Sequence, residues 1–175
     1  MAALDHPGIV GSTVWQHERG TEAFAQRLAQ ALRALEPAGN ALIELRGNLG
    51  AGKTTFARHL LHALGVVGRI KSPTYAVVET YQVLLEGVAL AIAHFDFYRF
   101  NDPDEWEEAG FRDVFAAPGF QLVEWPDKAQ GRLPTPDLVI EIHSQAHDGE
   151  QAEAPRHVHL RSFSRRGDAL VAACT

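Results

Sequence analysis

The spacing of hydrophobic residues predicts two amphipathic helices, at 21–36 and 53–64. Thr21 is expected to cap the first helix, and Gly65 follows the second, where a left-handed residue commonly ends a helix. Both segments therefore bury one face and expose the other. The inward positions are Phe24, Leu28, Leu32 and Leu35 in the first helix, and Phe56, Leu60, Leu61 and Leu64 in the second.

Shorter apolar runs predict strands between and after these helices. The runs at 40–45 and 120–124 are almost continuously apolar, as is typical of central strands in a parallel sheet. Segments 74–85 and 88–98 flank Glu86-Gly87 and predict an antiparallel hairpin. This order of elements predicts an α/β fold with a mainly parallel central sheet, an antiparallel hairpin portion and flanking helices. Further strands are expected at 137–143 and 157–163, and a short helix at 101–110 with Asp102 as its cap.

Length and composition fit one globular domain over 1–175. The chain has 46% hydrophobic and 22% charged residues and contains no apolar run long enough to span a membrane. A single cysteine, Cys174, and the absence of a signal sequence favour the cytoplasm. The net charge of −6 argues against unaided binding to nucleic acid. We expect a flexible N-terminus over 1–13 and a polar, mobile loop over 144–156.

The stretch "GNLGAGKTT" at 47–55 directly follows the first apolar strand and opens the second helix. It satisfies G-x-x-x-x-G-K-[ST], the phosphate-binding loop (P-loop) motif. The glycines let successive backbone N–H groups turn toward one anion, and the helix adds the positive end of its dipole. Lys53 is placed to reach the β- and γ-phosphates, Thr54 to ligate Mg²⁺ and Thr55 to contact the α-phosphate. The chain lacks the Asn-Lys-x-Asp stretch of guanine-specific proteins, which favours adenine.

A P-loop also requires an acidic residue at the end of a neighbouring strand to complete the magnesium shell. Asp96 and Glu124 each end an apolar segment, so one can ligate the metal while the other orients either water or the switching segment. The segment "KSPTY" at 71–75 is either a switch that senses the γ-phosphate or a simple turn around Pro73. Trp125, after Glu124, belongs either to the core or to the border of the site.

Five stretches in this order resemble one family: "GNLGAGKTT", "KSPTY", "HFDFYR", "DPDEWEEAGFRD" and "LVEWP". The family is the bacterial ATPase of tRNA threonylcarbamoyladenosine biosynthesis, TsaE, formerly YjeE. The resemblance implies a P-loop fold that binds ATP with Mg²⁺ and hydrolyses it slowly. It also implies TsaB and TsaD as partner proteins, with tRNA met only through that complex. The modified nucleotide is then adenosine 37 of tRNAs that read codons starting with A.

The same resemblance implies roles for individual residues. Lys53, Asp96 and Glu124 are the expected catalytic residues, and Thr54 with Glu124 would hold Mg²⁺. Trp125 would border the site. The expected switch-like residues are Ser72 and Thr74, and the expected nucleotide contacts are Glu18, Gly50, Ala51, Gly52, Lys53, Thr54 and Thr55.

Two features depart from the family pattern. Asn48 stands where many relatives carry aspartate, which removes one negative charge beside the phosphates. The 144–156 loop is longer than usual, so the family's nucleotide-contacting arginine has no clear match, although Arg156 is a candidate. No residue with the character of an arginine finger is evident either, which would account for slow hydrolysis.

Two other functions fit the P-loop. A small-molecule kinase would need an arginine-rich lid, and the stretch after Glu124 offers only Lys128 and Arg132. A nucleotide-gated binding module would need no catalytic carboxylate. His94, His143, His147, His157 and His159 have no spacing typical of a zinc site, so we expect structural or solvent-facing roles for them. The acidic stretch 105–108 is either a solvated helix face or a partner contact.

Overall fold

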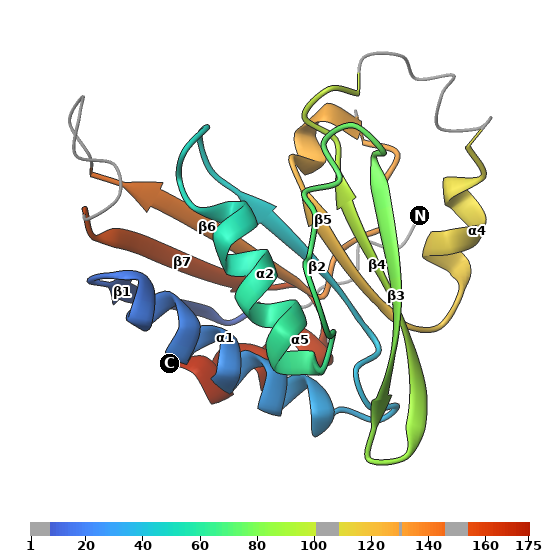
Figure 1. Ribbon diagram of the computed structural model, residues 1–175. Coiled ribbons are helices and arrows are strands. Elements are labelled where there is room, and N and C mark those ends of the chain that lie inside the picture. Colours follow the sequence, from blue (N-terminus) through green and yellow to red (C-terminus); the bar gives the residue numbers. More distant parts are fainter. Residues whose placement is uncertain (1–7, 101–108, 130, 146–153) are drawn as a thin grey trace.

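The protein is described here by a computed structural model that covers residues 8–100, 109–129, 131–145 and 154–175. Its strands form one sheet of seven, in the order β1-β7-β6-β2-β5-β4-β3 (Figure 1). The bounds are β1 (Val10–Trp15), β2 (Ala41–Arg46), β3 (Val78–Leu85), β4 (Val88–Asp96), β5 (Phe120–Glu124), β6 (Leu138–Ser144) and β7 (Arg156–Ser162).

The central strands β6, β2, β5 and β4 run parallel to one another, and the pairings at both ends of the sheet are antiparallel. At one edge β3 pairs with β4 as the predicted hairpin, and at the other β7 and β1 continue the sheet. The predicted α/β class with a parallel centre is confirmed. Residues 145–155 connect β6 to β7, which is fewer than the dozen or more residues that a crossover between parallel strands needs, so these two strands pair antiparallel.

Helices cover both faces of the sheet. The helices α1 (Glu18–Arg33), α2 (Lys53–Leu64) and α5 (Arg165–Cys174) lie on the near face in Figure 1 and share its larger hydrophobic core. On the other face, the short helix α4 (Phe111–Ala116) packs Phe111 against Phe95 and Phe97 of a second core. The 3₁₀ turn η1 (Pro126–Ala129) contributes Ala129 to this second core.

Several local predictions need correction. α1 begins at Glu18, and Thr21 is buried inside it, because the first turn closes on the carbonyl oxygen of His17 rather than on a threonine cap. Residues 10–13, expected to be flexible, belong to β1 and pair with β7. The helix predicted at 101–110 falls mostly on 101–108, outside the described residues, whereas Gly110 precedes α4. The expected 144–156 loop is narrower, because Ser144 and Arg156 each belong to a strand.

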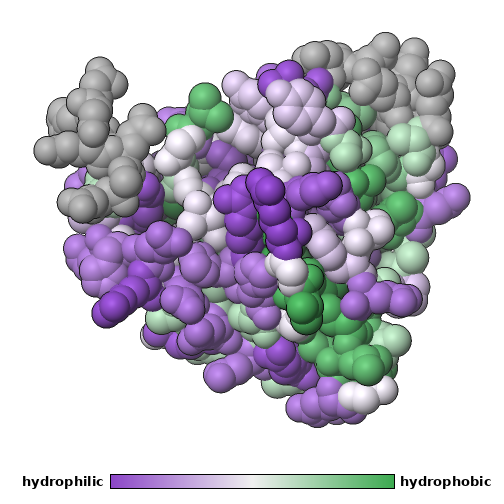
Figure 2. Space-filling view, viewed as in Figure 1, coloured by the Kyte–Doolittle hydropathy of each residue, from purple (hydrophilic) through white to green (hydrophobic). Residues whose placement is uncertain are grey.

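The surface in this view has a polar region and a hydrophobic region. Figure 2 shows hydrophilic residues over α1 and hydrophobic ones gathered at the lower right, over the turn of the β3–β4 hairpin. Leu84 and Val88, which lie at that turn, are 73% and 65% exposed. Val88 begins β4 and Asp96 ends it, so this hydrophobic surface is remote from the carboxyl ends of the parallel strands. Among the described residues, no helix combines the length and apolar character needed to cross a membrane.

The larger core depends on a cluster of three aromatic rings between β1, α1 and α2. The Phe56 ring lies 5.2 Å from that of Trp15 and 5.9 Å from that of Phe24, and all three side chains are buried. Replacing Phe56 with alanine is expected to lower the free energy of unfolding by about 3–5 kcal/mol, because it leaves a cavity that the neighbours cannot fill. Urea unfolding would measure the change. Val67→Ala, at a position 94% exposed, should change it by less than about 0.5 kcal/mol. Equal midpoints for the two variants would contradict this account.

Candidate functional site

Three adjacent parallel strands end together at one edge of the sheet. β2 leads into the P-loop, β5 ends at Glu124 and β4 ends at Asp96. Glu124 pairs in register with Asp96 on one side and with Leu45 on the other, so both carboxylates lie directly beside the start of the loop. The carboxyl ends of parallel strands are where open α/β sheets bind ligands.

The loop backbone depends on glycine at positions where a side chain would not fit. Gly47 has φ +141°, and a Cβ atom there would come within 2.3 Å of the carbonyl oxygen of Ile142. Gly52 has φ +105° and directly precedes α2, with its carbonyl accepting the N–H of Phe56. The first N–H groups of α2 have no partner within the helix and point toward the loop. The loop and α2 therefore have the geometry that suits an anion.

Lys53 lies in the centre of this site. It is only 5% exposed, and its Nζ donates to the carbonyl oxygens of Gly47 (2.6 Å) and Asn48 (2.9 Å). The same Nζ lies 3.9 Å from the ring centroid of Trp125. Burial lowers the pKa of Lys53, while the charges of Glu124 and Asp96 oppose that shift. The predicted phosphate-binding cation thus lies on the border residue, Trp125, whose φ of +57° turns the chain directly after β5.

The predicted metal pair is in direct contact. The hydroxyl of Thr54, in the first turn of α2, donates to Glu124 Oε2 at 2.8 Å. The other oxygen of that carboxylate, Oε1, lies 2.8 Å from Nε2 of the buried His94. A hydroxyl and a carboxylate oxygen are ligands that suit Mg²⁺, so the donor set fits this ion.

Asp96 connects the site to the 71–75 segment. Its Oδ2 accepts the Thr74 hydroxyl at 2.6 Å, and the hydroxyl oxygens of Thr74 and Ser72 lie 2.8 Å apart. The chain just after this segment carries backbone strain: Val77, a β-branched residue, has φ +66° while its carbonyl accepts the Asp96 N–H. Residues held in this region cost roughly 1–3 kcal/mol and persist only where surrounding contacts maintain them. The switch-like residues and Asp96 therefore form one hydrogen-bonded unit.

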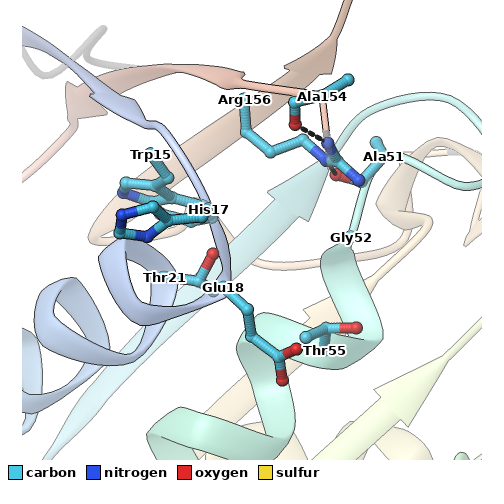
Figure 3. A pocket seen from close by; sticks show the side chains of 9 residues that line it. All are labelled: Trp15, His17, Glu18, Thr21, Ala51, Gly52, Thr55, Ala154 and Arg156. Atoms are coloured by element: carbon cyan, nitrogen blue, oxygen red, sulfur yellow. Dashed lines mark hydrogen bonds between the residues drawn. The ribbon is translucent and has the colours of Figure 1, made fainter. Parts of the chain in front are cut away.

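A pocket of about 230 Å³ opens beside the P-loop (Figure 3). Glu18 from the start of α1 and Thr55 from α2 line it, together with Ala51 and Gly52 of the loop. Arg156, at the start of β7, reaches across from the other side, and its Nε donates to the Ala51 carbonyl oxygen at 3.0 Å. The pocket continues from the phosphate loop, as a nucleoside site would, and Gly50 lies on the other side of the loop.

The structure thus groups all the predicted site residues around one loop, and adds two contacts that sequence reasoning missed. The sequence predicts only a structural or solvent-facing role for His94, although its position two residues before Asp96 places it on the same face of β4. Arg156 was only a candidate, because its approach to Ala51 requires β1 and β7 to bring the chain back to the loop. No sequence pattern specifies that return.

Comparison with known proteins identifies the family. Residues 15–153 match the model of the family described as threonylcarbamoyl adenosine biosynthesis protein TsaE. The tRNA threonylcarbamoyladenosine biosynthesis protein TsaE of Haemophilus influenzae is 41% identical over 68% of this chain and 73% of its own. The protein of the same name from Streptomyces coelicolor is 34% identical over 82% of this chain and 90% of its own.

The fold gives the same answer. The crystal structure of Bacillus subtilis YdiB superposes with a TM-score of 0.69 and 27% sequence identity, covering 97% of both chains. The sheet, the P-loop and α2 together make a P-loop NTPase-like fold, which supports an ATP-binding role for the chain. On the combined strength of the family match and this superposition, the chain belongs to the TsaE family.

Proposed function

We propose that the chain is the ATP-hydrolysing component of the machinery that makes N6-threonylcarbamoyladenosine at position 37 of tRNAs reading codons that start with A. In this proposal it acts with TsaB and TsaD. One observation carries the ATPase assignment: the Thr54 hydroxyl and Glu124 carboxylate meet at 2.8 Å beside a buried lysine at the start of α2. The family names of its relatives support the tRNA assignment.

Each residue in the site has a definite task in this proposal. The loop amides and Lys53 bind the phosphates, and the lysine exchanges its bonds to Gly47 and Asn48 for phosphate oxygens. Thr54 Oγ1 and Glu124 Oε2 would hold Mg²⁺, which when bound would supply positive charge beside the transferring phosphoryl group. Asp96 orients the attacking water, and its bond to Thr74 makes that orientation depend on the 71–75 segment.

The slow hydrolysis that we propose for the isolated chain fits the position of Arg99. Arg99, three residues after Asp96, lies over the Tyr75 ring at 4.4 Å and donates to the Tyr75 hydroxyl at 3.3 Å. In this contact the Arg99 guanidinium faces Tyr75, whereas an arginine finger faces the phosphates and is worth roughly 10³–10⁵ in rate. We propose that a partner protein supplies the missing charge or releases Arg99. With a net charge of −6, the chain meets tRNA only through its partners.

Reconstitution tests the proposal. ATP hydrolysis by the purified chain should be feeble, and it should rise when TsaB and TsaD are added together. Adding TsaB alone or TsaD alone should not give the full stimulation, so these two single additions are the controls. Omitting the chain should stop multiple-turnover modification of tRNA. Unstimulated hydrolysis, with modification proceeding normally in the absence of the chain, would refute the proposal.

A further inference from the structure

His94 is a polar residue in a column of apolar ones. It lies on the face of β4 that packs toward α2, following Ile92 and preceding Asp96 at alternate positions. Its side chain is 0% exposed, and its register partner on β5 is Leu122, also fully buried. An aliphatic residue would suit this position better, because a buried polar ring loses its contacts with water. The ring therefore needs a compensating contact.

That contact is Glu124. The only hydrogen bond that the described residues give the imidazole joins Nε2 to Glu124 Oε1 at 2.8 Å, and Nδ1 is buried without a partner among them. A carboxylate is only an acceptor, so Nε2 carries the proton and donates it. A buried polar atom left without a hydrogen bond destabilises the fold. A side chain with a purely structural role, such as leucine, would avoid this loss of stability.

We propose that His94 is a positioning residue for the metal-binding carboxylate: by occupying Oε1, it fixes the carboxylate plane and leaves Oε2 alone to face Thr54 and the cation. This inference depends on the proposed function, in which Thr54 and Glu124 hold Mg²⁺. Glu124 would then offer Oε2 to the cation, because Oε1 is already hydrogen-bonded to His94. Hydrogen bonds to ligating side chains commonly contribute 10–100-fold to metal affinity.

The test is the Mg²⁺ dependence of nucleotide binding, which requires no turnover. Calorimetry would measure the affinity for a non-hydrolysable ATP analogue over a range of Mg²⁺ concentrations and in a metal chelator. For His94→Leu, the Mg²⁺ concentration that gives half of the full gain in affinity should rise about 10–100-fold. Affinity in the chelator should stay within about twofold of the wild type, because the loop amides and Lys53 are unchanged.

Two amide variants separate positioning from packing. The side-chain N–H of glutamine reaches about as far as histidine Nε2, so His94→Gln should restore the Mg²⁺ midpoint to within about threefold. Asparagine is one methylene shorter and cannot reach Glu124, so His94→Asn should behave like His94→Leu; this pair decides the matter if the leucine variant fails to fold. Ile92→Val, on the same strand face without contact to Glu124, is the packing control.

The outcomes are distinct. A wild-type midpoint in His94→Leu or His94→Asn, or equal shifts for the glutamine and asparagine variants, would overturn the positioning role and leave the proposed function intact. A wild-type protein that binds the analogue equally with and without Mg²⁺ would overturn both. Urea unfolding of every variant establishes that the shifts come from folded protein.

Discussion

Replacing Lys53 with alanine is expected to lower ATP hydrolysis in the presence of TsaB and TsaD by about 10²–10³-fold, the loss typical when one donor to a developing negative charge is removed. Lys53 is the cation that the structure holds within the P-loop, bonded to Gly47 and Asn48 and set against Trp125. Alanine leaves the loop glycines and the start of α2 unchanged but removes that charge. A strain depleted of the native protein should regain the tRNA modification with the wild-type chain and not with this variant.

Lys128 provides the control for that experiment. It is an exposed lysine in η1, close in sequence to Glu124 but outside the P-loop. Lys128→Ala changes the net charge by the same amount and should complement the strain fully. If both variants complement, or if Lys53→Ala hydrolyses ATP at the wild-type rate, the nucleotide does not bind where we place it.

The second large effect is expected at Glu124. Glu124→Gln keeps the shape of a side chain that is 1% exposed and removes its charge, so the metal would lose its carboxylate ligand. Turnover should fall about 10²–10³-fold, while analogue binding in a metal chelator persists. A nucleotide-gated binding module would behave differently, because it would keep its biological activity after this change. Single-turnover hydrolysis and the tRNA modification assay together measure the difference.

Glu141 is the matched carboxylate for this comparison. Its side chain is 49% exposed on β6, where it contacts His143 rather than the P-loop. Glu141→Gln should leave both turnover and modification near their wild-type levels. Equal turnover in the two glutamine variants would contradict a metal-binding role for Glu124.

The parts of the site that the sequence predicts are those encoded locally. The loop, the strand before it and the helix after it occupy 41–64 without interruption, so motif and hydrophobic period specify them together. Asp96 and Glu124 were found because each ends an apolar strand, which is a property of a single segment. Their adjacency needs the strand order, and only the sheet supplies it.

The parts that were missed depend on distant contacts. The expectation of a flexible N-terminus over 1–13 fails at residues 10–13, because their pairing with β7 places them in β1. α5 was not predicted, although Ser164 caps it by accepting the Gly167 N–H. The bond from His94 to Glu124 was missed for the same reason: histidine is compatible with surface, core or site until the neighbouring strand is known.

The position of β5 has a consequence for biosynthesis. Glu124 meets Thr54 across 70 residues of sequence, and β5 forms hydrogen bonds with both β2 and β4. A nascent chain that has emerged from the ribosome only as far as β4 would contain the whole P-loop but not β5, the strand that lies between β2 and β4. Such a chain would also lack Glu124, which ends β5. The pair of Thr54 and Glu124 would therefore form only after β5 has emerged, so the proposed metal site would be completed late in synthesis.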